Sequence, residues 1–304
     1  MTKAAIYFNE LQPLLYGYYI CKGVIFLHRK MSAAVFTVLT AMFMCGCTSD
    51  KNTVGQSTEY NGRGGRTPAE TAFLTDGKEK VCYGQGYETD SDNRPVGAVQ
   101  AQEKYGSYGG RFIFGKDDRT IRLTFDEGYE NGCTGKILDI LKEKKVTATF
   151  YVTLDYVKSS PELVQRMINE GHEVGNHSCT HPSLPDISDD MVFEEIHGLE
   201  TYISDNFGGY KTVTMRPPRG EFSVRTLRIA KNMGYDTVLW SFAYNDWNTD
   251  AQPDRDTAYR RITSATHNGA VYLLHAVSET NTAILPDVID YWLDNGYTVK
   301  SISG

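Results

Sequence analysis

From Thr120 to the C-terminus, short apolar runs alternate regularly with longer amphipathic runs, and this alternation constrains the fold of the 304-residue chain more than any other feature. The apolar runs have the length and the β-branched and aromatic content of buried strands, whereas the runs between them carry apolar residues at helical spacing. Strands separated by helices predict parallel βαβ units. We therefore expect an α/β fold in which seven strands close into a distorted (β/α)7 barrel, with an open doubly wound sheet as the alternative.

The expected strands cover Ile121–Asp126, Ala148–Thr153, Glu173–His177, Val213–Arg216, Thr237–Phe242, Ala270–His275 and Tyr297–Ile302. The expected helices cover Lys136–Lys145, Pro161–Asn169 and Ser188–Phe207, and two more are marked by Leu227, Ala230 and Met233 and by Ile284, Val288, Ile289 and Trp292. Ser160 before Pro161 is a typical helix start, because proline is tolerated in the first helical turn.

Polar side chains gather at the ends of these strands. The first strand ends in two adjacent carboxylates, Asp126 and Glu127, before Gly128 breaks it. The later strand ends, or the residues just beyond them, carry His177, His181, Arg216, Asp246 and His275. Because the carboxyl ends of parallel strands form one rim of a barrel, these residues predict a common site.

Two of these residues have the spacing of metal ligands. In His177-Ser-Cys-Thr-His181 the imidazoles are four residues apart, and one helical turn would aim both at the same point. With a carboxylate from Glu127 or Asp126 they would form a His₂-carboxylate set that leaves a position open for water, as in catalytic zinc sites. We therefore expect a divalent cation, with zinc as first choice, and interpret Cys179 as a packed neighbour.

Five short segments resemble, in order and approximate spacing, the five motifs of the polysaccharide deacetylases, the NodB-homology carbohydrate esterases of family 4. These segments are TFDEG at Thr124–Gly128, HSCTH at His177–His181, RPPRG at Arg216–Gly220, DW at Asp246–Trp247 and LLH at Leu273–His275. The resemblance covers about Thr120 to Gly304 and implies the NodB-homology fold and a metal-dependent hydrolase that removes N-acetyl groups from amino sugars. TFDEGYENG, RPPRGEFS and LLHAVSETN look most like the delta-lactam-biosynthetic de-N-acetylases of spore cortex peptidoglycan, which act on N-acetylmuramic acid.

The resemblance also implies a role for each matching residue. The implied catalytic residues are Asp126 as general base, Arg216 as its partner, His275 as general acid and Asp246 as the residue that tunes it. The implied metal ligands are Glu127, His177 and His181. The implied substrate contacts are the backbone N–H of Arg219 at the oxyanion, Trp247 and Leu273 around the acetyl methyl group, and Tyr129.

Two residues depart from the pattern of the broad family. Glu127 stands where an aspartate is usual, so ligation of a metal would need the metal to shift or would go through water. Arg219 stands where many deacetylases of N-acetylglucosamine polymers have tyrosine. An arginine beside the pocket would pair bidentately with the lactyl carboxylate of N-acetylmuramic acid, which leads us to expect a muramic substrate.

The N-terminal part predicts export and a membrane anchor. An apolar run at 31–44 follows His28-Arg29-Lys30, as in a signal peptide, and is too short to span a bilayer comfortably. Gly46 before Cys47 resembles a lipoprotein cleavage site, with Cys47 as the lipidated residue; an uncleaved anchor is the alternative. We expect a leader over 1–47, a flexible tether over 48–97 and a catalytic domain over 98–304 that begins with an N-terminal arm.

Charge excludes one class of partner. The formal net charge is -7 and the chain has no basic run, so we expect no nucleic-acid partner. The expected protein is a monomeric, extracytoplasmic, lipid-anchored deacetylase of peptidoglycan that prefers peptide-free N-acetylmuramic acid. The alternatives are deacetylation of N-acetylglucosamine in peptidoglycan or an exopolysaccharide, a carbohydrate-binding protein of the same fold without catalysis, and a structural surface lipoprotein.

Overall fold

The computed structural model describes residues 77–304. The leader expected over 1–47 and the tether residues 48–76 lie outside the described residues, so both stay predictions. Within the described range, none of the helices is both long enough and apolar enough to cross a lipid bilayer.

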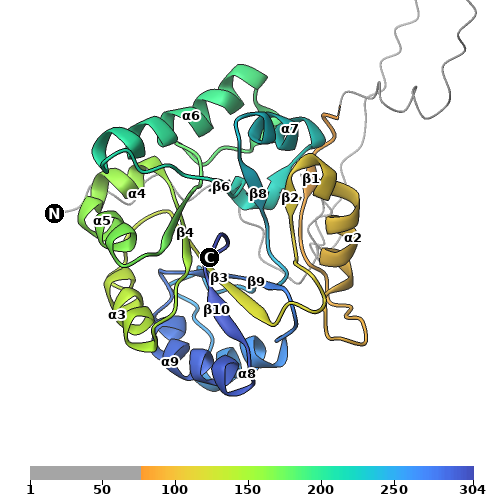
Figure 1. Ribbon diagram of the computed structural model, residues 1–304, viewed down its shortest axis with the longest axis vertical. Coiled ribbons are helices and arrows are strands. Elements are labelled where there is room, and N and C mark those ends of the chain that lie inside the picture. The colour runs from red at the N-terminus through yellow and green to blue at the C-terminus, as the bar shows by residue number, and fades with distance from the viewer. Residues whose placement is uncertain (1–76) are drawn as a thin grey trace, which may run out of the picture. The chain divides into compact units, whose positions relative to one another are not determined.

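A wholly parallel sheet forms the centre of the described domain (Figure 1). Its eight strands are β2 (Gly110–Arg111), β3 (Thr120–Glu127), β4 (Thr149–Val152), β5 (Glu173–Asn176), β6 (Thr214–Met215), β8 (Asp236–Val238), β9 (Ala270–His275) and β10 (Thr298–Lys300). They follow the order β10-β3-β4-β5-β6-β8-β2, and β9 pairs with β3. All the strands expected from the sequence are present, and β2 is added from the segment before Thr120.

Strand β3 is central to this sheet, because three strands pair with it. β9 runs along Ile121–Asp126, β10 pairs with the first residues of β3, and β4 pairs with its last residues. An isolated parallel bridge between Phe242 and Tyr272 joins the chain after β8 to β9. Beside it, the Leu273 N–H donates to the Phe242 carbonyl at 2.8 Å. The sheet therefore curls into the expected distorted (β/α)7 barrel, and the open doubly wound alternative is not adopted.

Helices surround the strands (Figure 1). They are α2 (Val96–Tyr105), α3 (Thr134–Lys144), α4 (Leu154–Ser159), α5 (Pro161–Asn169), α6 (Asp189–Asn206), α7 (Val224–Asn232), α8 (Arg255–Ser264) and α9 (Glu279–Asp294). The five expected helices match α3, α5, α6, α7 and α9. Ser188 caps α6 by accepting a hydrogen bond from Met191 N–H, as its position before the helix suggests.

The main apolar core lies between the strands and these helices. Ile121, Leu123 and Phe125 of β3 are buried in one cluster with residues of α3 and α9, including Leu138 and Trp292. Side chains alternate between the two faces of a strand, so the odd-numbered residues of β3 face the helices and the even-numbered ones face the barrel interior. Burial of each large apolar side chain contributes about 1.5–3 kcal/mol, which makes this alternation a strong constraint on the register of β3.

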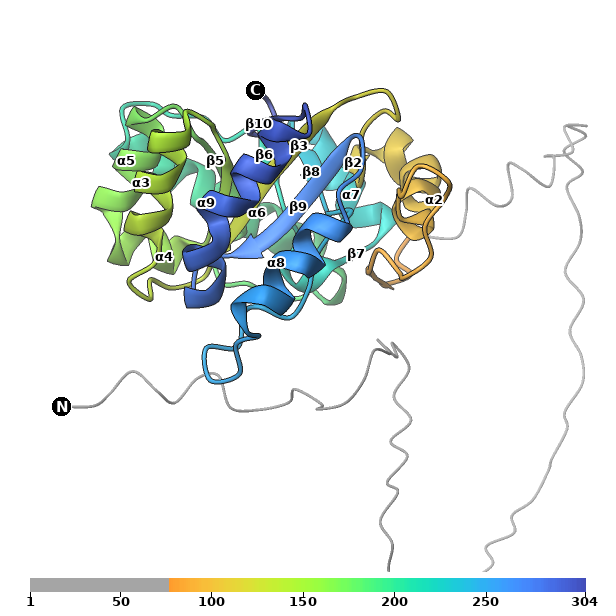
Figure 2. The ribbon, with the colours of Figure 1, turned by 90° about the horizontal axis from the view of Figure 1, so that it is seen from below.

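Residues 77–97 differ from the expected tether because they pack against the domain. Strand β1 (Val81–Cys82) pairs antiparallel with β7 (Glu221–Phe222). Tyr83 is buried against Phe112 and Trp240, and its hydroxyl donates to the Trp240 carbonyl at 2.6 Å. Figure 2 shows α2 on this side of the barrel, near β2 and β7. The folded domain therefore includes residues before 98, where the sequence analysis placed its start.

Candidate active site

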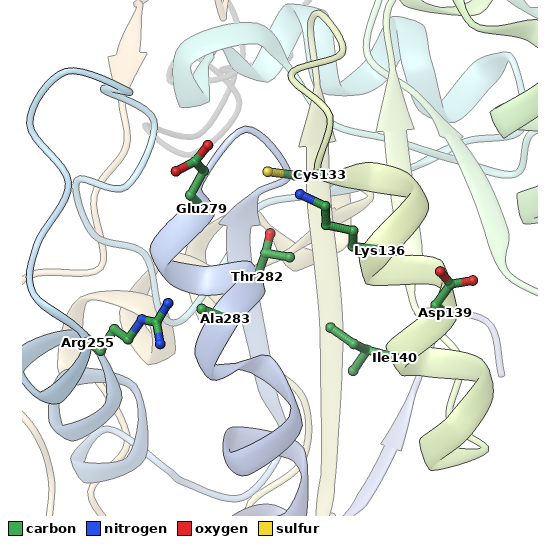
Figure 3. A pocket seen from close by; sticks show the side chains of 8 residues that line it. All are labelled: Cys133, Lys136, Asp139, Ile140, Arg255, Glu279, Thr282 and Ala283. Carbon is green, nitrogen blue, oxygen red and sulfur yellow. The ribbon is translucent and has the colours of Figure 1, made fainter.

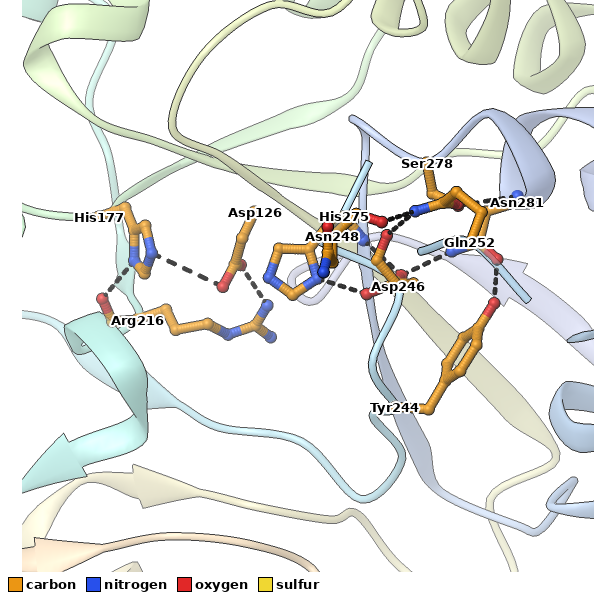
Figure 4. A network of polar contacts seen from close by, with 10 residues as sticks. All are labelled: Asp126, His177, Arg216, Tyr244, Asp246, Asn248, Gln252, His275, Ser278 and Asn281. Atoms are coloured by element: carbon orange, nitrogen blue, oxygen red, sulfur yellow. Dashed lines mark hydrogen bonds and ion pairs between the residues drawn. The ribbon is translucent and has the colours of Figure 1, made fainter. Parts of the chain in front are cut away.

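Several of the expected site residues meet at the carboxyl ends of the strands, and Figure 4 shows Asp126, His177, Arg216, Asp246 and His275. Asp126 is the penultimate residue of β3, His275 is the last residue of β9, and the two are direct partners in the β3–β9 pairing. His177 follows β5 and Arg216 follows β6. Asp246 comes from the loop between β8 and α8. These residues therefore lie at one rim of the barrel, as the sequence predicts.

A buried arginine holds Asp126. Arg216 is fully buried, and its Nη1 donates to Asp126 Oδ1 at 2.7 Å. Its Nε and Nη2 donate to the carbonyls of Val238 and Leu239, and the guanidinium carbon lies 4.3 Å from the centre of the Tyr151 ring. Burial alone would raise the pKa of Asp126, but the charges of Arg216 and two nearby histidines outweigh it and lower this pKa. Asp126 is therefore a carboxylate at neutral pH.

The two imidazoles after β5 lie side by side, although no helix aligns them. Their ring centres are 4.9 Å apart, and Ser178 and His181 both have positive φ, which makes the segment a tight turn. The Asn176 side chain accepts a hydrogen bond from Ser178 N–H, and the Ser178 hydroxyl accepts one from His181 N–H. The expectation of a helical turn was wrong, because these side-chain caps produce the same convergence without a helix.

Both imidazoles are suited to bind a cation. His177 Nδ1 lies 2.9 Å from the Arg216 carbonyl, which leaves Nε2 free, and this Nε2 is 3.6 Å from Asp126 Oδ2. Burial lowers the pKa of His177 and lowers that of His181 to about 3, with smaller contributions to the latter from His177 and Arg219. Neutral imidazoles are the metal-binding form, so this donor set fits a divalent cation in its chemistry.

Glu127 lies apart from the two imidazoles. It shares the outer face of β3 with the apolar core residues, is completely buried, and both its oxygens are 3.4 Å from the Thr134 hydroxyl at the start of α3. Burial, with the nearby Glu130, raises the pKa of Glu127 well above its usual range. Within residues 77–304, no three His, Cys, Asp or Glu side chains form a ready metal site. The carboxylate that lies beside His177 is that of Asp126, so the structure does not bring Glu127 together with the other two expected ligands.

His275 and Asp246 form a tightly bonded pair. His275 Nδ1 lies 2.7 Å from Asp246 Oδ1, and the His275 backbone N–H donates to Asp246 Oδ2 at 2.9 Å. A carboxylate can only accept, so Nδ1 carries the proton and Nε2 is the free ring nitrogen. Burial would lower the pKa of His275, but Asp246 outweighs it and raises this pKa. The pair is therefore suited to carry a proton to a leaving group.

The expected substrate contacts differ in their exposure to solvent. Arg219 is exposed, has a φ of 60°, and lies in the single 3₁₀ turn Pro218–Gly220 that follows Arg216. Tyr129 and Trp247 are 48% and 41% exposed, so each offers an aromatic face to a ligand. Leu273 is buried in β9 two residues before His275. Arg219, Tyr129 and Trp247 are thus accessible to a ligand, whereas Leu273 is buried in the sheet.

Sequence reasoning missed the residues that support Asp246. Asn281, Gln252 and Tyr244 surround it in one polar network (Figure 4). The only sequence signal was the inclusion of Asn281 in the run LLHAVSETN.

A separate groove of about 540 Å³ lies between α3 and α9 and is lined by Cys133, Lys136, Asp139, Ile140, Arg255, Glu279, Thr282 and Ala283 (Figure 3). None of the expected site residues lines this groove, so it is distinct from the candidate site.

The barrel and its rim define a class of protein. Hydrolysis of an amide or ester requires a base, an acid and often a bound cation. A carboxylate kept charged by a buried arginine, two neutral imidazoles beside it and an Asp–His pair on the neighbouring strand are groups of the types that this chemistry uses. This arrangement is that of a hydrolase.

The comparisons with known proteins give the family. Residues 115–238 match the polysaccharide deacetylase family. The peptidoglycan-N-acetylmuramic acid deacetylase PdaA of Bacillus subtilis is 42% identical over 200 residues, which are 66% of this chain and 75% of PdaA. The solved structure of Bacillus subtilis PdaA, a family 4 carbohydrate esterase, matches with a TM-score of 0.70 at 38% identity and covers 74% of this chain and 96% of that chain. The chain therefore belongs to the polysaccharide deacetylases and is an enzyme of this hydrolytic family.

A second relative has another named substrate. The peptidoglycan-N-acetylglucosamine deacetylase PgdA of Listeria monocytogenes is 32% identical over 187 residues, which are 62% of this chain and 39% of PgdA. The family alone therefore leaves the choice of amino sugar open.

Proposed function

We propose that the protein removes the acetyl group from N-acetylmuramic acid residues of peptidoglycan that have lost their stem peptide. The observation that carries the hydrolytic part of this proposal is the pairing of Asp126 with His275 across β3 and β9, each held in its charge state by a buried partner. Similarity to PdaA over three quarters of that protein's length supports the muramic substrate.

In the proposed reaction Asp126 is the general base. Its Oδ1 is held by Arg216, and Oδ2 is the oxygen that faces His177 and takes the proton of the attacking water. His177 and His181 would hold a divalent cation, zinc as first choice, which when bound lowers the pKa of a water molecule toward about 7. Glu127 would join these ligands only after its side chain leaves Thr134.

His275 is the general acid. Asp246 raises the pKa of His275 and so favours the imidazolium, in which both ring nitrogens carry a proton. The Nδ1 proton stays bonded to Asp246, and Nε2 gives its proton to the nitrogen of the amide as the C–N bond breaks. The products are acetate and a free amino sugar. A positioned acid or base of this kind contributes about 10²–10⁴-fold to the rate.

The rim around these residues binds the substrate. The backbone N–H of Arg219 faces the oxyanion, and such a donor is worth about 2.7–4 kcal/mol. Trp247 and Leu273 line the space for the acetyl methyl group, and Tyr129 stacks on the sugar. The exposed guanidinium of Arg219 pairs with the lactyl carboxylate, which only the muramic sugar carries. We therefore expect Arg219→Tyr to lower turnover of peptide-free muramic substrates more than of chitin-like oligomers, and equal losses on both would refute this role.

The proposal extends to the setting of the enzyme. The freed amine would close on the lactyl carboxylate to a muramic delta-lactam, as in spore cortex peptidoglycan during sporulation. The enzyme would act as a monomer outside the cytoplasm, anchored to the membrane through a lipid on Cys47.

Two other functions remain as outcomes of one experiment. Similarity to PgdA favours deacetylation of N-acetylglucosamine, and the fold alone would suit a carbohydrate-binding protein without catalysis. Acetate release is measured from peptidoglycan with and without prior amidase treatment, after chelation and again after added zinc. We expect release only from amidase-treated material, restored by zinc and lost in His275→Ala. Release from intact material with deacetylated glucosamine would support the first rival, and no release at all would support the second.

A further inference from the structure

The Asp246 carboxylate has a hydrogen-bond partner besides His275. Asn281, in the first turn of α9, donates from Nδ2 to Asp246 Oδ2 at 2.6 Å. Together with the two hydrogen bonds from His275, the carboxylate accepts three hydrogen bonds from described residues. Asn281 and Asp246 are both almost completely buried, so water does not readily replace the amide.

The orientation of the Asn281 amide is itself determined by its neighbours. The Tyr244 hydroxyl donates to Asn281 Oδ1, which turns Nδ2 toward Asp246 (Figure 4). The backbone N–H of Asn281 donates to the Ser278 hydroxyl, the cap of α9, at 3.0 Å. The amide can therefore present only its donor side to the carboxylate.

A second chain of hydrogen bonds also links the start of α9 to Asp246, through Gln252. The Ser278 hydroxyl donates to the Gln252 side chain, and Gln252 Nε2 donates to the Asp246 carbonyl at 2.7 Å. Asp246 itself lies in the segment between β8 and α8, which has no helix or strand of its own in the described chain. The start of α9 thus fixes both the backbone and the carboxylate of a loop residue, while His275 is fixed by β9.

We propose that Asn281 is a positioning residue that holds the Asp246 carboxylate in the plane that His275 Nδ1 requires, and so aims His275 Nε2 at the leaving group. This inference rests on the proposed role of His275 as general acid. Asn281 touches neither the substrate rim nor the imidazole in the described contacts, so it acts only through Asp246.

The test is a double-mutant cycle on acetate release. Asn281→Leu keeps the size of the side chain and removes its donor. Because hydrogen bonds to charged groups are the strong ones, we expect kcat to fall about 10- to 100-fold with KM nearly unchanged. In an Asp246→Ala background the same substitution should change kcat by less than about twofold, because residues that act as a unit are not additive. An equal loss in both backgrounds, or a loss confined to KM, would overturn the proposal.

The matched control is Thr282→Val at the next position of α9. It removes a hydrogen bond to the Ser278 carbonyl and no contact with Asp246, so it measures the cost of disturbing the start of the helix. We expect kcat within about twofold of wild type, and an equal fall in this variant would reduce Asn281 to a structural role. Should Asn281→Leu fail to fold, Tyr244→Phe keeps the amide, removes the hydroxyl that orients it, and should lower kcat several-fold.

A second readout separates this proposal from the proposed function. The Nδ1 proton of His275, bonded to a carboxylate, is expected as a downfield ¹H NMR signal that is absent in His275→Ala. The signal should be lost or moved in Asn281→Leu and retained in Thr282→Val, whether or not the enzyme releases acetate. An unchanged signal in Asn281→Leu would refute the positioning role alone, whereas absence of acetate release by the wild type would refute the proposed function alone.

Discussion

Replacing Asp246 by asparagine tests the general-acid pair with almost no change in side-chain volume. In the structure both oxygens of Asp246 accept, Oδ1 from His275 Nδ1 and Oδ2 from the His275 backbone and Asn281. Asparagine has a single oxygen, so its NH₂ group must face one of these donors or force the imidazole into the other tautomer. Either outcome disfavours the imidazolium, whose Nε2 is the proton donor, or turns the His275 ring away from the leaving group.

The expected magnitude follows from the pKa of His275. Burial lowers this pKa, and the charge and hydrogen bond of Asp246 raise it above the ordinary histidine value. With a neutral amide the contribution of Asp246 is lost, while burial and Arg216 still lower this pKa and Asp126 still raises it, so the pKa of His275 falls. Because the general acid must carry a proton, the alkaline limb of the kcat/KM profile moves to lower pH. At neutral pH the loss approaches the full contribution of a general acid, about 10²–10⁴-fold.

The assay is acetate release by Asp246→Asn and wild type across the neutral range, with His275→Ala as the reference for complete loss of the acid. We expect Asp246→Asn to fall near His275→Ala at alkaline pH and to recover partly as the pH is lowered. An Asp246→Asn enzyme with the wild-type profile and rate would refute the reasoning, because the pair would then have no part in proton transfer.

Three further predictions concern other parts of the chain. Glu127→Gln should retain zinc affinity within about threefold by calorimetry, since Glu127 lies at Thr134; a loss of about tenfold or more, as large as loss of a hydrogen-bond partner of a ligand, would mean that Glu127 does contribute to the site. Tyr83→Ala should lower the free energy of unfolding by about 3 kcal/mol in urea titration, because a buried aromatic anchor is lost, and an unchanged midpoint would mean that the 77–97 segment adds no stability. His267 bridges the Ala265 carbonyl and the Ser241 hydroxyl, and burial lowers its pKa to about 4. Between about pH 6.5 and 4 the histidine is protonated in the unfolded chain but not in the folded one. The contribution of His267 to the free energy of unfolding is therefore complete above about pH 6.5 and falls by about 3 kcal/mol as the pH drops to about 4. His267→Gln should remove this part of the acid-induced loss of stability, as measured by urea titration at several pH values, and an unchanged loss would contradict the role of His267.

The fold was predictable from the sequence because its strands are short, continuous apolar runs. Strands buried on both faces need no long-range information to be recognised, and Ile121–Asp126 and Ala270–His275 match the observed β3 and β9 within two residues. The strand-end rule then placed Asp126, His177, Arg216 and His275 at one rim. The order of strands and helices along the chain was thus enough to predict that these side chains lie at the same end of the barrel.

The missed elements lack such a local signal. Helix α4 has six residues, and α8 is dominated by arginine and threonine and buries only Ala258, Ile262 and Thr263. Residues 77–97 hold their place through contacts with distant partners, such as that of Tyr83 with Trp240, which composition cannot predict. Low local hydrophobicity was therefore mistaken for a lack of fixed structure.

The side-chain directions at the rim were only partly predictable. The period-two alternation that buries Ile121, Leu123 and Phe125 also places Glu127 on the outer face, so the pattern already contained the separation of Asp126 from Glu127. The convergence of His177 and His181 was predicted for the wrong reason, because a tight turn with positive φ at Ser178 replaces the helical turn. The support of Asp246 by Asn281 depends on tertiary structure alone.

The most direct test of the account is the mass of the glycan product after amidase-treated peptidoglycan is incubated with zinc-loaded wild type and with Asp126→Asn. If Asp126, held by Arg216, is the base, the wild type yields muramic residues without their acetyl group, and Asp126→Asn yields them at least about 100-fold more slowly. Muramic residues that keep their acetyl group with the wild type, or lose it equally fast with Asp126→Asn, would contradict the account.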